Sequence, residues 1–240
     1  MWGTLINVAG ILIGGIAGLA MKRPLSPANQ AMLKITMGAL TVFFGLQLTW
    51  RNLGGTFVHV LKQLLIVVLA LTLGKLLGKL CRFQKFSNSA GQYARRKMEE
   101  AATKTKGRPA DGFVICSILF CVAPLALLGS VQEGLANYFQ PLVIKALVDG
   151  LSMMAFVMMF GAASLFSFVP VLAYQGLLTL GARALEPWLT AHALVQPINA
   201  TGGLLVFCVA LIILDLKKIE AADYLPSLLV APVLAWWIGY

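Results

Sequence analysis

Charged residues are scarce in this chain of 240 residues, and so are the side chains that most enzymes use for chemistry. Asp, Glu, Lys and Arg make up 12% of the sequence, which has two histidines and four cysteines. An ordinary soluble domain carries about 25% charged residues. With 59% hydrophobic residues and a mean hydropathy of +0.85, this chain has more apolar surface than one soluble core of its size buries. The composition therefore excludes soluble, disordered and fibrous proteins and indicates a polytopic membrane protein.

Motifs for catalysis and metal binding are missing as well. The four cysteines form no CxxC pair and mostly lie in apolar runs, while the two histidines stand far apart. The sequence contains no GxSxG, no HExxH, no P-loop and no dinucleotide-binding fingerprint. We therefore expect no enzyme activity, no cofactor and no metal site.

Eight stretches of mostly apolar residues are long enough to cross a bilayer, which takes about 20 residues. They are 3–21, 30–50, 57–80, 112–131, 141–165, 168–185, 198–215 and 223–240. The sixth is the weakest, because Pro170 and the tripeptide Tyr174-Gln175-Gly176 interrupt its apolar run. The sequence predicts an all-α membrane protein of about eight transmembrane helices, with the sixth short, broken or re-entrant.

Basic residues are concentrated between the third and fourth spans. The segment from Arg82 to Arg108 holds eight Lys and Arg residues, and further basic pairs flank the first and seventh spans. With eight spans these charges share one side, so the positive-inside rule places 82–111 in the cytoplasm and both termini outside. The net charge of +10 is then explained by orientation and by the headgroups of the lipid bilayer, and we expect no nucleic-acid partner.

Spans 1–3 resemble spans 6–8 at an offset of about 165 residues, as in the alignment of Thr36 and Gly38 with Thr201 and Gly203. Equivalent spans are five helix positions apart, an odd number, so they run in opposite directions. This predicts an inverted-topology repeat, the usual plan of secondary transporters. The predicted divisions are 1–81 as the first three-helix repeat, 82–111 as a basic cytoplasmic loop, 112–166 as two inserted helices and 167–240 as the second repeat.

Polar groups inside spans are costly unless they have partners, so each one is a candidate. Lys145 and Asp149 lie four residues apart on one helical face and predict a pair, either an ion or proton site or a fixed structural salt bridge. Glu133, after the fourth span, either lines an outer vestibule within reach of Lys145 or is a solvated loop carboxylate.

Neutral polar residues extend this pathway, although each also fits a helix–helix hydrogen bond. An interrupted helix at Tyr174 would have to line a water-filled cavity. A helix start near Asn199 would aim free N–H groups at an anion. The predicted solute or ion pathway consists of Asn7, Thr36, Glu133, Lys145, Asp149, Tyr174, Gln175, Asn199 and Thr201.

Gly10, Gly14 and Gly18 form two consecutive GxxxG steps on the first span. Such a face allows another helix to approach closely. The partner helix belongs either to the same chain or to a second copy, which would make a homodimer.

Motifs along nearly the whole chain resemble one bacterial family. They include Gly3-Thr4-Leu5-Ile6-Asn7, the step from Lys145 to Asp149, and Gly202-Gly203-Leu204-Leu205. They are similar to the integral-membrane family of domain of unknown function 554, the YqgA-like proteins. The resemblance implies a multi-pass protein of the bacterial inner membrane and no established activity. Against the family pattern, Pro124 replaces a small residue and is expected to kink the fourth span.

The function that these features favour is passage of a small solute or ion across the inner membrane. Two inverted halves would alternate access to a central site, without ATP hydrolysis by this chain, although a fixed channel fits the same repeat. On this interpretation Asp149→Asn abolishes flux and leaves the fold intact. The alternatives are a non-transporting scaffold or assembly partner acting through the basic loop, and a lipid-modifying enzyme.

Overall fold

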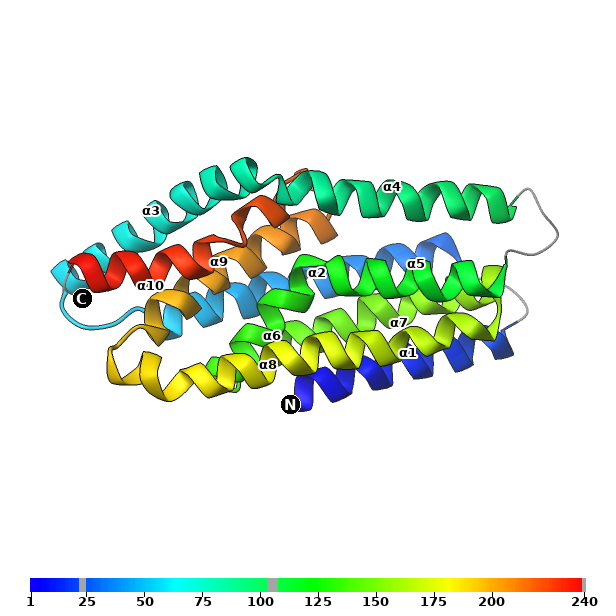
Figure 1. The fold of residues 1–240 in the computed structure, drawn as a ribbon, viewed down its shortest axis with the longest axis horizontal. Helices are drawn as coiled ribbons and strands as arrows, with labels where there is room; N and C mark the ends of the chain where they lie inside the picture. Colours follow the sequence, from blue (N-terminus) through cyan, green and yellow to red (C-terminus); the bar gives the residue numbers. More distant parts are fainter. Residues whose placement is uncertain (22–24, 103–107, 239–240) are drawn as a thin grey trace.

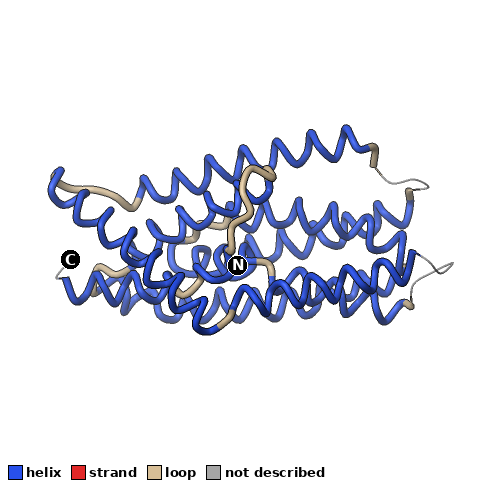
Figure 2. The backbone as a smooth tube through the Cα atoms, turned by 90° about the horizontal axis from the view of Figure 1, so that it is seen from above, coloured by secondary structure: helices blue, strands red, loops and turns tan. Residues whose placement is uncertain are grey.

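The structure is a computed structural model that describes residues 1–21, 25–102 and 108–238. All regular structure in these residues is helical (Figures 1 and 2). The helices are α1 (Trp2–Ala20), α2 (Pro27–Arg51), α3 (Phe57–Cys81), α4 (Phe83–Ala102), α5 (Pro109–Val122), α6 (Pro124–Ala136), α7 (Gln140–Phe160), α8 (Phe168–Ala191), α9 (Val195–Ile213) and α10 (Ser227–Ile238), with short 3-10 helices η1 (Ala162–Ser167) and η2 (Ala221–Tyr224).

Seven helical segments in the described residues are long and apolar enough to cross a membrane, or eight if α5 and α6 cross as one bent span. Large apolar side chains such as Ile13, Leu65 and Trp237 are exposed on their outer faces. Exposed apolar surface of this extent is typical of helices surrounded by lipid. The predicted all-α fold with about eight spans is therefore confirmed in its coarse form, while the inverted repeat stays a prediction.

The broken span is the fourth. Helices α5 and α6 meet at Ala123 with a bend of 55°. Pro124 explains the bend, since it has no N–H to continue the hydrogen bonds of α5 and its ring excludes a regular helix there. This is the kink expected from the sequence.

The sixth span, by contrast, is complete. Helix α8 runs without interruption through Tyr174, Gln175 and Gly176. Pro170 lies in its first turn, where backbone N–H groups have no partner within the helix in any case. The short, broken or re-entrant helix expected here does not form.

Glycines hold α1 against α7. A Cβ added at Gly14 would lie 2.1 Å from the carbonyl oxygen of Gly150, and one added at Gly10 would lie 2.6 Å from that of Ala146. The close helix packing predicted for this face is confirmed within the chain. Because α7 covers Gly10, Gly14 and Gly18, the face is not open to a second copy in this structure.

Two further close pairs join distant parts of the sequence, α2 with α9 and α3 with α10 (Figure 1). A Cβ on Gly45 would lie 2.8 Å from the carbonyl oxygen of Gly203, and one on Gly203 would lie 2.6 Å from that of Gly45. In the other pair, Gly74 faces the backbone of Ser227. The bundle is therefore built from helix pairs whose backbones nearly touch.

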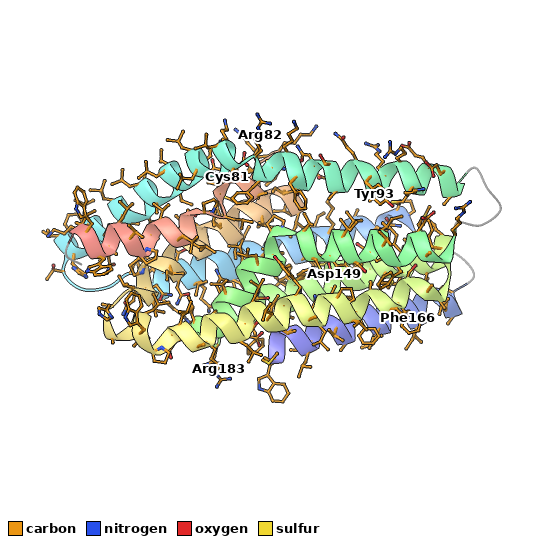
Figure 3. The ribbon with its side chains drawn as sticks, in the orientation of Figure 1. Cys81, Arg82, Tyr93, Asp149, Phe166 and Arg183 are labelled. Carbon is orange, nitrogen blue, oxygen red and sulfur yellow. The ribbon has the colours of Figure 1, made fainter. Side chains whose placement is uncertain are left out.

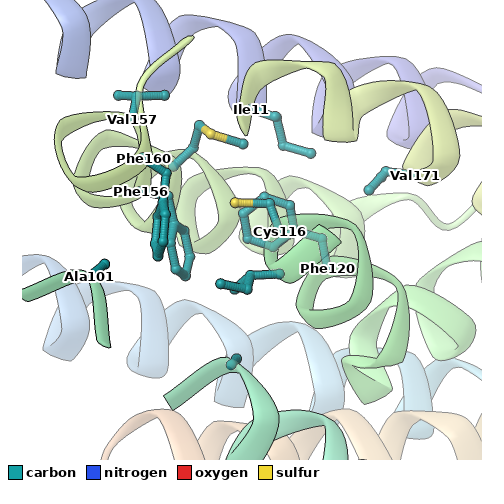
Figure 4. Packing of buried hydrophobic residues seen from close by; sticks show 11 residues of the cluster. Ile11, Ala101, Cys116, Phe120, Phe156, Val157, Phe160 and Val171 are labelled. Atoms are coloured by element: carbon teal, nitrogen blue, oxygen red, sulfur yellow. The ribbon is translucent and has the colours of Figure 1, made fainter. Parts of the chain in front are cut away.

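Helix α4 turns one face back onto the bundle. Ala94 and Ala101 are buried in the same apolar cluster as Phe156 and Phe160 of α7, as Figure 4 shows for Ala101 and the two phenylalanines. The Lys97 ammonium lies 3.0 Å from Glu100 and 3.8 Å from Asp111 of α5. The hydrogen bond with Glu100 raises the pKa of Lys97, and the negative charge of Asp111 raises it further. The predicted basic segment therefore contains a helix docked on the spans, and its residues 103–107 lie outside the described part of the chain.

Candidate functional site: a buried polar cluster

The Glu133 carboxylate caps the start of α1. It accepts hydrogen bonds from the backbone N–H groups of Gly3, at 2.6 Å, and Thr4, at 3.3 Å. The hydroxyls of Thr4 and Thr179 donate to it at 3.2 and 3.5 Å. The first N–H groups of a helix have no partners within it, and its N-terminal end attracts negative charge.

This arrangement excludes one of the two sequence interpretations of Glu133, the solvated loop carboxylate. Helix α6 extends to Ala136, so Glu133 is helical, and only 3% of its surface is exposed. The α-amino group of Met1 also lies 3.2 Å from its Oε1 atom. Within the described residues its partners come from α1 and α8 and not from Lys145. The solvated loop carboxylate is therefore wrong, and Lys145 is not among the hydrogen-bond or ion-pair partners of Glu133 in the described residues.

Lys145 and Asp149 form an ion pair along α7, and both side chains are almost fully buried. The Lys145 ammonium also lies 5.7 Å from the centre of the Phe120 ring, and the amide of Asn7 lies beside the Asp149 carboxylate. Asp149 is near the middle of the bundle in Figure 3. The pair predicted from the spacing is confirmed. Burying two charges costs several kcal/mol for each ion, which close pairing offsets only in part.

Asn7 connects the ion pair with α8. Its Nδ2 atom donates to Oε1 of Gln175 at 3.3 Å. Thr4 is one turn earlier on α1 and Thr179 one turn later on α8, and their hydroxyls lie 3.5 Å apart. Polar side chains thus face each other over two turns. We call the polar cluster the set Thr4, Asn7, Glu133, Lys145, Asp149, Gln175 and Thr179, whose members are 0–4% exposed.

Some polar atoms in this interior have no hydrogen-bond partner among the described residues. In the cluster they are Oδ1 of Asn7 and Nε2 of Gln175. A second group lies where α6 meets α9, with both amide atoms of Gln132, Oδ1 of Asn199 and Oγ1 of Thr201. A buried polar group without a partner costs about 1–3 kcal/mol. Unpartnered acceptors and donors in the interior are groups that a hydrated solute or ion can satisfy.

Not every predicted residue joins the cluster. Thr36 is on an exposed face of α2, where its hydroxyl donates to the carbonyl of Met32 in the same helix. Tyr174 is partly buried, one position around α8 from Gln175. Asn199 and Thr201 are buried, but α9 already begins at Val195, so the free N–H groups lie before Asn199 and the expected anion site at that helix start does not form.

Sequence reasoning missed Thr4 and Thr179. Their spacing carried the signal, because Thr4 precedes Asn7 by three residues and Thr179 follows Gln175 by four. Residues three or four apart share a face of a helix. Thr4 therefore lies on the same face of α1 as Asn7, and Thr179 lies on the same face of α8 as Gln175. Only Asn7 and Gln175 of these four were predicted from the sequence.

Surface hollows lie away from the cluster. One of about 530 Å³ between the start of α2 and α7 is lined by residues including Lys34, Met37 and Met158. Another of about 500 Å³ lies at the loop between α2 and α3, beside Arg51 and His59. Neither is lined by a member of the cluster. All seven members of the cluster are buried, and neither of these two hollows reaches them.

Comparison with known proteins gives a match along almost the whole chain. The family described as "Protein of unknown function (DUF554)" matches residues 2–236. The "Uncharacterized membrane protein YdfK" of Bacillus subtilis is 26% identical over 239 residues, which cover 99% of this chain and 97% of that protein. The "Uncharacterized protein YqgA" of Escherichia coli is 28% identical over 242 residues, covering 99% and 98%. No solved structure matches the chain.

Proposed function

This chain belongs to the DUF554 family, whose name assigns no activity, and we propose a function from the site. The protein passes a small solute or ion across a membrane through the polar cluster. The protein moves its solute without hydrolysing ATP. Its membrane is the bacterial inner membrane, with both termini outside and the segment 82–111 in the cytoplasm. The basic residues near the span ends support this orientation.

One observation carries the proposal, the burial of three ionisable side chains among spans. Glu133, Lys145 and Asp149 are each at most 4% exposed. Ionisable residues within transmembrane segments are rare and usually mark ion or substrate pathways. A purely structural role for all three would be unusual, because apolar side chains would fill the same volume at lower cost.

The cluster is also placed where a movement of helices would change it. Its members come from α1, α6, α7 and α8, so each helix carries part of a shared set of hydrogen bonds. If α1 and α8 are equivalent helices of an inverted repeat, the bond between Asn7 and Gln175 joins the two halves. Rocking of such halves exposes a central site alternately to the two sides.

Proteoliposome flux tests the proposal. The purified protein is reconstituted and screened against protons, alkali cations, halides and small organic acids and amines. We expect at least one to move, and the double variant Lys145→Met/Asp149→Leu to move it at most about a tenth as fast. The control is Lys34→Met/Asp215→Asn, which removes an ion pair that is 43% and 76% exposed.

The control variant is expected to keep the wild-type rate, because its ion pair lies outside the polar cluster. Equal rates in all three proteins would contradict passage through the cluster. So would the absence of flux for every solute from the folded wild-type protein.

A further inference from the structure

A polar hollow of about 410 Å³ lies where α3 meets α4. Its walls come from the end of α3, the first turns of α4 and the segment at η2. Basic and amide side chains dominate them. The lining residues are Lys79, Arg82, Gln84, Lys85, Asn88, Ser89, Gln92, Glu220 and Asp223.

Reciprocal hydrogen bonds fix the frame of this hollow. The backbone N–H of Gln84 donates to Oδ1 of Asp223 at 2.7 Å, and the Gln84 side-chain oxygen accepts from the N–H of Ala222 at 3.1 Å. Gly78 contributes close packing, because a Cβ there would lie 2.0 Å from the carbonyl oxygen of Asp223. The start of α4 is therefore held against η2, and the side chains around it are displayed from a fixed backbone.

Positive charge exceeds negative charge in the hollow. Lys79, Arg82 and Lys85 are exposed, and none of them forms an ion pair within the described ranges. Asp223 is only 4% exposed, and its carboxylate already accepts a backbone hydrogen bond. Glu220 is then the one remaining carboxylate of the lining, against three cations. Figure 3 shows Arg82 projecting away from the bundle at this junction.

Large apolar side chains flank the same cations. Leu80 is 79% exposed and Phe86 is 68% exposed, and Leu76 and Phe83 are exposed beside them. A soluble phosphate has nothing to gain from such a flank, whereas a phospholipid presents acyl chains next to its phosphate. Basic residues interleaved with aromatic and leucine side chains at the end of a span are typical of the membrane interface.

We propose that this hollow binds the phosphate headgroup of an anionic phospholipid. Lys79, Arg82 and Lys85 contact the phosphate, and the side-chain amide groups of Asn88 and Gln92 donate hydrogen bonds to the rest of the headgroup. The acyl chains lie along Leu76, Leu80 and Phe83. Bound lipid would then anchor the α3–α4 junction at the membrane surface.

Lipid retention measures this directly. The full chain is purified with mixed phosphatidylglycerol and phosphatidylcholine, and bound lipid is counted by native mass spectrometry. We expect wild type to retain phosphatidylglycerol selectively. A basic side chain near an anionic membrane contributes roughly a fivefold gain in affinity, so Lys79→Gln/Arg82→Gln/Lys85→Gln should bind on the order of 100-fold more weakly. The readout is independent of flux, so it stands apart from the proposed function.

Two variants act as controls. Arg95→Gln/Arg96→Gln removes exposed cations from the other half of α4 and is expected to retain the lipid. Lys79→Arg/Arg82→Lys/Lys85→Arg keeps the charges and is also expected to retain it. Equal loss in the Arg95 and Arg96 variant, or no selectivity in wild type, would overturn the site. Displacement of the lipid by millimolar glycerol phosphate would overturn the lipid in favour of a soluble phosphate.

Discussion

Asp149→Asn is expected to lower the free energy of unfolding by about 3–5 kcal/mol, the usual cost of removing one partner of a buried ion pair. The Lys145 side chain is 2% exposed, so its ammonium would stay in the interior without its counterion. Reversible unfolding in mixed micelles measures the change. Asp215→Asn is the matched control, because that carboxylate is 76% exposed, and it should cost less than about 1 kcal/mol.

The double variant Lys145→Met/Asp149→Leu should recover most of the lost stability. Replacing a whole buried ion pair by apolar side chains of similar volume is often neutral or stabilising. The charge-free double variant is therefore the right protein for the flux comparison. Asp149→Asn alone is expected to disturb the fold, because Lys145 and Asp149 are both buried, whereas the sequence by itself suggested that the fold would stay intact. A double variant as unstable as Asp149→Asn would show that the charges are not what makes the single replacement costly.

Glu133→Leu should cost about 3 kcal/mol or more, because the N–H groups of Gly3 and Thr4 would both lose a buried partner at about 1–3 kcal/mol each. Glu133→Gln keeps one acceptor oxygen and is expected to cost about half as much. The control Glu186→Gln should change the free energy of unfolding by less than about 0.5 kcal/mol, since within the described part of the chain Glu186 accepts only from the Thr190 hydroxyl one turn away.

Hydrogen exchange locates the effect of Glu133. Loss of the carboxylate should speed exchange of the amides in the first turn of α1 by tenfold or more and leave α9 unchanged. An equal rise in exchange throughout the bundle would instead mean that Glu133→Leu unfolds the protein globally. In that case the Glu133 carboxylate would not specifically stabilise the first turn of α1.

The sequence predicted the charged residues of the site better than the neutral ones. The spacing of four residues between Lys145 and Asp149 predicts that they pair. An ionisable side chain within a span almost always faces the protein interior, so its orientation can be predicted from the sequence. Thr36 illustrates the opposite case. Both the lipid and the protein core are apolar, so the pattern of α2 does not show which face is inside. A threonine facing lipid simply bonds to its own helix, as Thr36 does with Met32.

Helix breaks were predicted only in part, because the effect of a proline depends on its place in the helix. Pro124 falls inside an apolar run long enough for a span and bends it. Pro170 falls within the first turn of α8, where it fits without loss. Helix α9 follows the same rule, because it begins at Val195, three residues before the predicted span 198–215, and holds Pro197 in its first turn. The apolar run does not show where a helix begins, so the sequence alone does not show whether a proline lies in the first turn or inside the helix.

The central claim is that water reaches the polar cluster from one side of the membrane during the working cycle. Thiol accessibility tests it most directly and requires no knowledge of the solute. Two proteins with a single cysteine are compared in membranes, one with Thr179→Cys and one keeping the native Cys116. Both positions are at most 1% exposed in this structure, but Cys116 lies in the apolar cluster. We predict that a small, charged thiol reagent labels Thr179→Cys and leaves Cys116 unlabelled. Equal labelling of the two, or no labelling of Thr179→Cys in the folded protein, would contradict the claim.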